Sequence, residues 1–203
     1  MNLSDLHSLA SVGDEQVGVE GQRVLRLIHD LSRPDCTRDV AQTCVGRITE
    51  AVLPLVGQNS QFRRPLLVPI LRAGAAMWGA ANAYFNSPET SFVFAEKKKG
   101  THQVDSWWPK KSDFIDRDVI ILDPIIATGD TVRHVCSHVM SFVGDQRKPR
   151  LTVIACYAAR EGMQNILAST PVDIFAACVA EGVTPTGYLI PSTNGDLGDK
   201  LFN

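Results

Sequence analysis

The chain has 203 residues, a formal net charge of −2 and 44% hydrophobic residues. This length is sufficient for the core of one α/β domain, and the near-neutral charge argues against a general nucleic-acid-binding surface. No apolar run is long enough to span a membrane, and the first residues lack the basic start and apolar block of a secretory signal. The five cysteines form no CxxC pair, and their odd number argues against a complete disulfide framework. We therefore expect reduced thiols in a cytoplasmic protein.

The first part of the chain predicts two helices. Residues 22–31 carry apolar side chains at helical spacing, and Pro34 ends this helix. Thr37 is a suitable N-cap for a second helix, because its hydroxyl can accept a hydrogen bond from the first turn, where Asp39 follows.

The rest of the chain alternates between apolar runs and segments of helical periodicity. Strands are predicted at residues 65–71, 92–95, 119–122, 151–157 and 172–179. Helices are predicted from just after Gly74 to about residue 85, over residues 132–143 and over residues 161–167. This alternation predicts an α/β fold with a parallel sheet.

Residues 119–131, VIILDPIIATGDT, form the segment around which the chain is organised. A short apolar strand runs up to Asp123, and Pro124 cannot continue a central strand ladder. A small polar loop containing Gly129 then leads into a helix, whose first N–H groups and dipole attract an anion. The order of strand, carboxylate, glycine loop and helix predicts a phosphate site with a carboxylate beside it. The alternative is an ordinary strand-to-helix turn in which Gly129 supplies a positive φ.

A second segment has the same layout. The strand predicted at residues 65–71 runs into Arg72 and Gly74, and an Ala-rich helix follows. An Arg in this place can bind a diphosphate through two parallel hydrogen bonds. The alternative is an Arg that caps nearby carbonyl groups.

Three segments together resemble the uracil phosphoribosyltransferases, a branch of the type I phosphoribosyltransferases. Residues 119–131 resemble the family's motif for 5-phosphoribosyl 1-diphosphate (PRPP), in the form with Asp-Pro rather than two adjacent acids. Residues 69–74, PILRAG, match the family pattern almost letter for letter, and residues 181–202 resemble its uracil-recognition segment in order and spacing. The resemblance extends over residues 37–202.

The resemblance implies the type I phosphoribosyltransferase fold, a parallel sheet flanked by helices. It implies a single domain over residues 1–203, with a small hood formed mainly by about residues 180–203. The implied reaction is pyrimidine salvage: transfer of the phosphoribosyl group from PRPP to uracil, giving UMP and diphosphate. The implied partners are these small molecules, without nucleic acid or membrane, in a homo-oligomer that is a dimer or larger. Mg²⁺ would be bound mainly through the diphosphate of PRPP, and no side chain is assigned as a metal ligand.

The resemblance also implies roles for individual residues. The implied catalytic residues are Arg72, Asp123 and Asp196. The implied PRPP-binding residues are Arg72, Lys97, Asp123, Pro124, Ile125, Ile126, Ala127, Thr128, Gly129, Asp130, Thr131 and Asp196. The implied base-recognition residues are Tyr188, Leu189, Gly195, Asp196 and Leu197. In this scheme Asp123 holds the ribose hydroxyls, the backbone amides of residues 127–131 hold the 5-phosphate, and Arg72 and Lys97 stabilise the diphosphate. For Tyr188, the alternative is a core aromatic whose hydroxyl reaches the surface.

The sequence departs from the family pattern in three places. Lys97 stands where the uracil enzymes carry an Arg, so the charge is kept but the planar fork is lost. Asp130 stands where they usually have a Gly. Two unit charges ~4 Å apart cost ~1–4 kcal/mol at intermediate-to-high dielectric, so Asp130 must point outward or weaken phosphate binding. Residues 191–195 are one residue longer than the pattern, and the extra residue lies within residues 192–194.

Two other features leave alternatives open. The charged residues 96–100 are followed by Trp107 and Trp108, which could indicate a solvated loop or a nucleic-acid contact, and the family carries a mobile segment here that closes over PRPP. His134 and His138 have a spacing that can bind zinc, but no HExxH glutamate or cysteine pair lies nearby in the sequence. We expect them to be polar residues on an exposed helix face.

At the level of function, two alternatives remain. One is a phosphoribosyltransferase with a different base acceptor. The other is a non-catalytic regulator that keeps the fold and binds nucleotides or RNA. The near-neutral charge and the presence of all three motifs argue against the regulator.

Overall fold

The computed structural model describes residues 6–13, 17–98, 101, 103–143, 147–192 and 197–202. The strands of its main sheet are β1 (Leu6–Ser11), β2 (Leu66–Leu71), β3 (Glu89–Thr90), β4 (Val93–Lys97), β5 (Val104–Trp107), β6 (Val119–Leu122), β7 (Ile125–Ile126), β8 (Leu151–Ala159) and β9 (Asp173–Ala180). A separate pair of short strands comprises β10 (Gly182–Val183) and β11 (Leu189–Ile190). The helices are α1 (Val19–Ser32), α2 (Arg38–Asn59), α3 (Ala75–Tyr84), α4 (Asp130–Val143), α5 (Arg160–Leu167) and α6 (Leu197–Phe202), with a 3₁₀ turn at Lys111–Phe114.

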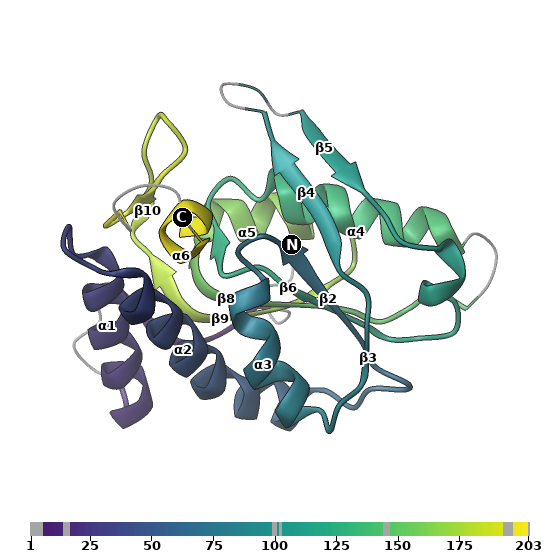
Figure 1. The fold of residues 1–203 in the computed structure, drawn as a ribbon, viewed down its shortest axis with the longest axis horizontal. Coiled ribbons are helices and arrows are strands. Elements are labelled where there is room, and N and C mark those ends of the chain that lie inside the picture. Colours follow the sequence, from purple (N-terminus) through teal and green to yellow (C-terminus); the bar gives the residue numbers. More distant parts are fainter. Residues whose placement is uncertain are drawn as a thin grey trace.

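The main sheet lies between two layers of helices (Figure 1). Its strand order is β1-β9-β8-β6-β2-β4-β5, with β3 paired to β2 and β7 paired to β8. The pairings are parallel except for β4 and β5, which form an antiparallel hairpin. The predicted α/β fold with a mostly parallel sheet is therefore confirmed.

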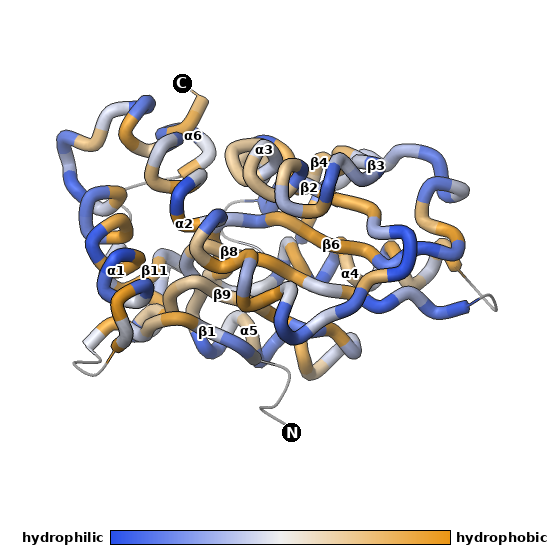
Figure 2. The backbone as a smooth tube through the Cα atoms, turned by 90° about the horizontal axis from the view of Figure 1, so that it is seen from below, coloured by the Kyte–Doolittle hydropathy of each residue, from blue (hydrophilic) through white to orange (hydrophobic). Residues whose placement is uncertain are grey.

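Helices cover both faces of this sheet, and this explains the composition of its central strands. β6 and β8 are buried at every position, as expected for parallel strands covered on both sides. Apolar residues of α1, α2, α3 and α6 pack into one core, whereas those of α4 and α5 pack into a second core. Figure 2 shows the hydrophobic strands β6, β8 and β9 running through the middle of the molecule.

The predicted helices and strands are present, with small shifts at their ends. Thr37 caps α2, because its hydroxyl accepts a hydrogen bond from the backbone N–H group of Val40 at 3.4 Å. The strand predicted at residues 92–95 spans Val93–Lys97 instead, so Lys97 is its last residue and not part of a solvated loop.

Six of the described strands were not predicted: β1, β3, β5, β7, β10 and β11. β1 pairs in parallel with β9 at one edge of the sheet. β5 is polar and alternates between half-buried and exposed residues, because only one of its faces packs against the protein. β7 resumes the pairing with β8 after Pro124, whose carbonyl oxygen accepts hydrogen bonds from the N–H groups of Cys156 at 3.1 Å and Tyr157 at 3.0 Å. The proline therefore interrupts the ladder without ending it.

The expectation of an exposed face at His134 and His138 is wrong. Both side chains are half-buried, and Nε2 of His134 lies 2.8 Å from the hydroxyl of Ser106. The ring of Trp108 stacks on His138 at a centroid distance of 5.0 Å, and its Nε1 donates to the Ser106 hydroxyl at 2.9 Å. Burial, together with the neighbouring His138, lowers the pKa of His134, so its ring is neutral at neutral pH. These contacts hold β5 against α4.

Candidate active site

The carboxyl ends of β2, β4 and β6 open into a cleft of about 1030 Å³. The β4–β5 hairpin and the segment around β10 and α6 rise from the same edge of the sheet (Figure 1). Open parallel sheets bind their ligands in the crevice outside the carboxyl ends of the strands. Most of the predicted site residues line the cleft: Arg72, Lys97, Asp123, Ile125, Ile126, Ala127, Thr128, Gly129, Asp130, Thr131, Tyr188, Leu189 and Leu197.

Three predicted site residues are not in that lining. Pro124 is buried, and its carbonyl group belongs to the hydrogen-bonded ladder with β8, so it forms no part of the cleft wall. Gly195 and Asp196 lie outside the described residues. Their roles therefore stay predictions.

The loop between β7 and α4 is held in shape by close backbone packing. Gly129 has a φ of +81°, and a Cβ atom there would overlap with the backbone of Gly162 in α5. A Cβ atom on Gly162 would overlap with the loop in the same way. Asn165 of α5 donates a hydrogen bond from Nδ2 to the carbonyl oxygen of Thr128 at 3.1 Å. The loop thus needs a glycine on each side of this contact, and its shape is set by the packing of the chain itself.

Asp123 lies at the entrance to this loop, on the wall of the cleft. Its backbone N–H group donates to the carbonyl oxygen of Ile154 at 3.2 Å, which extends the β6–β8 pairing one residue beyond the strand. The residue is half-buried. A carboxylate is therefore placed a few residues before the N-terminus of α4, and the two can serve the hydroxyl groups and the phosphate of one ligand.

Arg72 follows β2, the strand beside β6, after a cis Leu71–Arg72 peptide bond. Its guanidinium donates from Nη2 to Oδ1 of Asp199 in α6 at 2.6 Å, and both side chains are about half exposed. This pair joins the end of β2 to the C-terminal helix. Asp199 was not predicted as a site residue, although the repeated Gly-Asp step at residues 195–199 was a signal for it.

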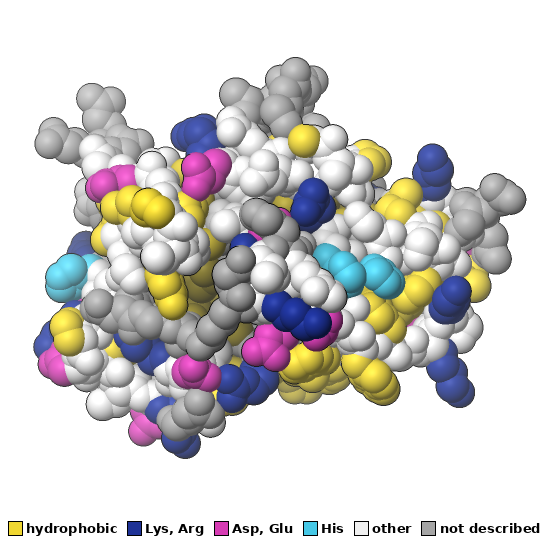
Figure 3. Space-filling model, turned by 90° about the horizontal axis from the view of Figure 1, so that it is seen from above, with side chains coloured by type: hydrophobic (Ala, Val, Ile, Leu, Met, Phe, Trp, Pro, Cys, Tyr) yellow, Lys and Arg dark blue, Asp and Glu magenta, His cyan; other side chains and the backbone are white. Residues whose placement is uncertain are grey.

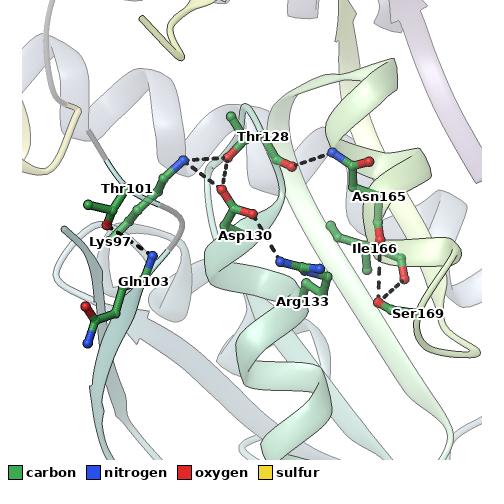
Figure 4. A network of polar contacts seen from close by, with 9 residues as sticks. All are labelled: Lys97, Thr101, Gln103, Thr128, Asp130, Arg133, Asn165, Ile166 and Ser169. Atoms are coloured by element: carbon green, nitrogen blue, oxygen red, sulfur yellow. Dashed lines mark hydrogen bonds and ion pairs between the residues drawn. The ribbon is translucent and has the colours of Figure 1, made fainter. Parts of the chain in front are cut away.

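Lys97 and Asp130 form an ion pair within a polar network at the N-terminus of α4 (Figure 4). Nζ of Lys97 lies 2.7 Å from Oδ2 of Asp130 and donates to the hydroxyl of Thr128 at 3.1 Å. That hydroxyl donates to Oδ2 of Asp130 at 2.8 Å, and Nη2 of Arg133 donates to Oδ1 at 3.3 Å. The Asp130 side chain is 7% exposed. Of the two alternatives given for Asp130, the outward orientation is therefore not the one observed: the side chain is buried, and Lys97 and Arg133 offset its charge.

The C-terminal segment contributes the opposite side of the cleft. Tyr188 lines the cleft and is 48% exposed, so it is not a core aromatic, whereas Leu189 and Leu197 are buried. Tyr157 of β8 reaches this segment from within the core, since its fully buried side chain donates from the hydroxyl to the carbonyl oxygen of Pro191 at 3.2 Å. Burial raises the pKa of Tyr157, so the hydroxyl keeps its proton at neutral pH. The sequence indicated Tyr157 only as part of an apolar strand.

The cysteines offer no reactive thiolate to the cleft. All five are free thiols. Burial raises the pKa of both Cys156 and Cys178 to about 12, so these thiols are protonated at neutral pH and are poor nucleophiles.

The surface carries charges of both signs. On the face shown in Figure 3, basic and acidic side chains are interspersed, and neither sign forms a continuous patch among the coloured atoms. This mixture agrees with the formal net charge of −2. Among the described residues, no helix combines the length and the apolar composition needed to cross a membrane.

Comparison with known proteins gives consistent matches. Residues 28–203 match the family model described as uracil phosphoribosyltransferase. A uracil phosphoribosyltransferase from Streptomyces avermitilis is 33% identical over 172 residues, which cover 83% of this chain and 79% of that protein. The AQ2163 protein from Aquifex aeolicus has a similar structure, with a TM-score of 0.79 at 19% identity over 95% of this chain and 97% of that one. The Mycobacterium tuberculosis orotate phosphoribosyltransferase, solved in complex with PRPP, has a TM-score of 0.54 at 10% identity over 81% and 91% of the two chains.

Proposed function

The chain belongs to the uracil phosphoribosyltransferase family, and we propose that it transfers the phosphoribosyl group of PRPP to uracil, giving UMP and diphosphate. It is a pentosyltransferase with the type I phosphoribosyltransferase fold. One observation carries the proposal: a single cleft is lined by Arg72, by Asp123 with the loop after it, and by Tyr188 and Leu189. These residues come from the three segments that carry the family resemblance.

The proposed mechanism rests on positioning and on charge. Uracil N1 forms a bond to C1 of the ribose and gives up its proton to the departing diphosphate or to water, while the bond from C1 to the diphosphate oxygen breaks. Positive charge therefore develops on the sugar and negative charge on the leaving group. We assign Asp123 to the ribose hydroxyls and the backbone amides of residues 127–131 to the 5-phosphate, which would hold the sugar in place for the attack. Arg72 would donate two parallel hydrogen bonds to the diphosphate. No covalent intermediate on the protein is required.

Mg²⁺ fits this site as an ion held mainly by the substrate. Among the described residues, no group of three or more His, Cys, Asp and Glu side chains could hold a metal ion. Mg²⁺ is commonly bound through one or two carboxylates and the phosphates of a substrate, and Asp123 is a described cleft carboxylate that lies just before the phosphate loop. When bound, Mg²⁺ would neutralise the charge that develops on the departing diphosphate.

The domain organisation, the oligomeric state and the cellular location are part of the same proposal. We infer a single domain over residues 1–203 whose hood, about residues 180–203, covers the base. The placement of Tyr188 and Leu189 on the cleft supports this. We also infer a homo-oligomer, supported by the exposed Trp107 on the β4–β5 hairpin. The free thiols support a cytoplasmic location.

The substitution Tyr157→Phe should raise KM for uracil about threefold to tenfold and leave KM for PRPP unchanged. The reason is that the Tyr157 hydroxyl fixes the Pro191 carbonyl within the base-recognition segment, and a buried hydrogen bond contributes about 0.5–1.5 kcal/mol. Steady-state kinetics with each substrate varied in turn measures both constants. Tyr84→Phe is the matched control, because Tyr84 is 44% exposed on α3 and outside the cleft. An equal rise in both KM values would show that Tyr157 supports the fold in general and not the base site.

The test of the function is diphosphate release from PRPP and Mg²⁺, measured with and without uracil. We expect release that depends on uracil. Release that depends on another base would establish a different acceptor. No release with any base, by a protein that still binds PRPP, would establish the non-catalytic regulator instead.

A further inference from the structure

Lys97 and Asp130 both depart from the family pattern, and the structure places them in direct contact. Their charged atoms are 2.7 Å apart, and the side chains are 30% and 7% exposed. Each residue alone would weaken a PRPP site, one by losing the guanidinium fork and the other by adding a negative charge. In contact, the lysine neutralises the aspartate and the aspartate fixes the position of the lysine.

The ion pair connects β4 and α4, two elements that are far apart in the sequence. Lys97 ends β4, whose hairpin is paired to β2 through Ile70 with Val93 and Leu71 with Phe94. Asp130 begins α4, directly after the phosphate loop. Figure 4 shows Lys97 approaching Thr128 and Asp130 from one side of the loop, while Asn165 contacts the Thr128 carbonyl from the other. The hairpin is therefore tied to the loop that is proposed to bind the 5-phosphate.

The position of the Lys97 ammonium indicates which phosphate it can reach. Among the described residues it donates to Asp130 and to the Thr128 hydroxyl, and an ammonium has three N–H donors, so these two contacts leave it able to donate to a phosphate oxygen at this loop. Arg72, in contrast, is bound to Asp199 of α6. The two cations thus contact different parts of the cleft wall, the phosphate loop and the C-terminal helix.

The local charges allow an anion to bind beside Asp130. Lys97 and Arg133 carry two positive charges against one negative charge on Asp130, and the N-terminus of α4 adds a partial positive charge. The net charge of these three side chains is therefore positive, and the loop can still attract a phosphate beside the Asp130 carboxylate. Without the carboxylate, Lys97 would lose its ion pair with Asp130 at the loop.

We propose that Asp130 is a positioning residue that holds Lys97 at the phosphate loop, where Lys97 contacts the 5-phosphate of PRPP and not its diphosphate. This inference rests on the proposed use of PRPP, and it reassigns the diphosphate role that the family resemblance implied for Lys97. Arg72 keeps that role.

The first experiment separates the two ends of PRPP by using a fragment for each. Calorimetry measures the Kd of ribose 5-phosphate and, separately, the Kd of inorganic diphosphate with Mg²⁺, for the full chain and for Lys97→Met. We expect Lys97→Met to weaken ribose 5-phosphate binding about tenfold to a hundredfold, the range for a lost charge-assisted hydrogen bond. Diphosphate binding should change less than twofold. The reverse pattern, or no change in either, would overturn the inference.

The second experiment tests whether Asp130 acts through Lys97. Asp130→Asn should weaken ribose 5-phosphate binding about threefold to tenfold in the native background, because a charge-assisted bond becomes a neutral one. It should have less than a twofold effect in the Lys97→Met background, as expected for coupled residues. An equal effect in both backgrounds would contradict the coupling. Tighter binding by Asp130→Asn would show that Asp130 competes with the phosphate.

The control and the kinetics distinguish positioning from general stability. Asp105→Asn removes a carboxylate from an exposed ion pair with Lys98 on the same hairpin, 3.2 Å apart, and should leave the Kd of ribose 5-phosphate unchanged. In turnover, Asp130→Asn should raise KM for PRPP without changing kcat or KM for uracil. If the unmodified chain binds neither fragment and forms no UMP, the proposed function itself fails. If the unmodified chain binds both fragments and forms UMP, and Lys97→Met does so equally well, this inference alone is refuted and the proposed function stands.

Discussion

Replacing Asp123 by Asn is expected to lower kcat/KM for PRPP by about 10²–10³-fold while the protein stays folded. The carboxylate lies on the cleft wall at the entrance to the phosphate loop, where it can accept hydrogen bonds from both ribose hydroxyls. Asn is nearly the same size but has one acceptor oxygen and no charge, so it would lose the stronger bonds without leaving a cavity. Because the sugar becomes positively charged in the transition state, part of the loss should appear in kcat.

The matched control for this prediction is Asp35→Asn. Asp35 forms an exposed ion pair with Arg33 between α1 and α2, outside the cleft, so its loss should change kcat/KM less than twofold. Circular dichroism and the midpoint of thermal unfolding establish whether each variant is folded. A folded Asp123→Asn protein with the turnover of the unmodified chain would refute the role assigned to Asp123.

Acceptor choice should show the largest effect, with uracil preferred over cytosine, orotate, hypoxanthine and adenine by about 10⁴-fold or more in kcat/KM. The edge of uracil presents an acceptor, a donor and an acceptor in turn, and a backbone segment can match this order in one register. Leu189 is buried beside the cleft, and the Tyr157 hydroxyl holds the carbonyl group of Pro191. The residues just before the extra position are therefore anchored, and we expect the extra residue to bulge outward and leave the register intact.

Deleting Thr193 tests this interpretation within the same screen. The deletion restores the length of the family pattern, and an outward bulge predicts that the preference for uracil stays within about threefold of that of the full chain, because the pocket itself is unchanged. A shift of preference to another base on deletion would show that the extra residue enters the pocket. Preference of the full chain for any base other than uracil would contradict the uracil assignment and leave the PRPP site untouched.

The sequence predicted those features that depend on local patterns. Continuous apolar runs predicted the buried strands β2, β6, β8 and β9, because parallel strands covered on both faces need apolar residues at every position. Thr37 predicted the start of α2, since a cap depends on a single side chain and the N–H groups next to it. The order of strand, Asp123, glycine loop and helix predicted a loop between β6 and α4, and the structure places this loop at the cleft; its binding of a phosphate stays a prediction.

The features that the sequence did not predict depend on contacts between distant segments. β5 has no apolar run, and its pairing with β4 becomes evident only in the structure. The contact between Lys97 and Asp130 joins positions that each looked unfavourable alone, and no pattern within either segment indicates the other. Tyr157 appeared to be one more apolar strand residue, although its hydroxyl reaches Pro191.

The most direct test of the account is the identity and stoichiometry of the products. The purified chain is incubated with PRPP, Mg²⁺ and uracil labelled on the ring, and labelled UMP and diphosphate are quantified in the same sample. We predict labelled UMP and diphosphate in equal amounts, with the label transferred intact. Diphosphate formed together with ribose 5-phosphate but without labelled UMP, or no conversion of PRPP at all, would contradict it.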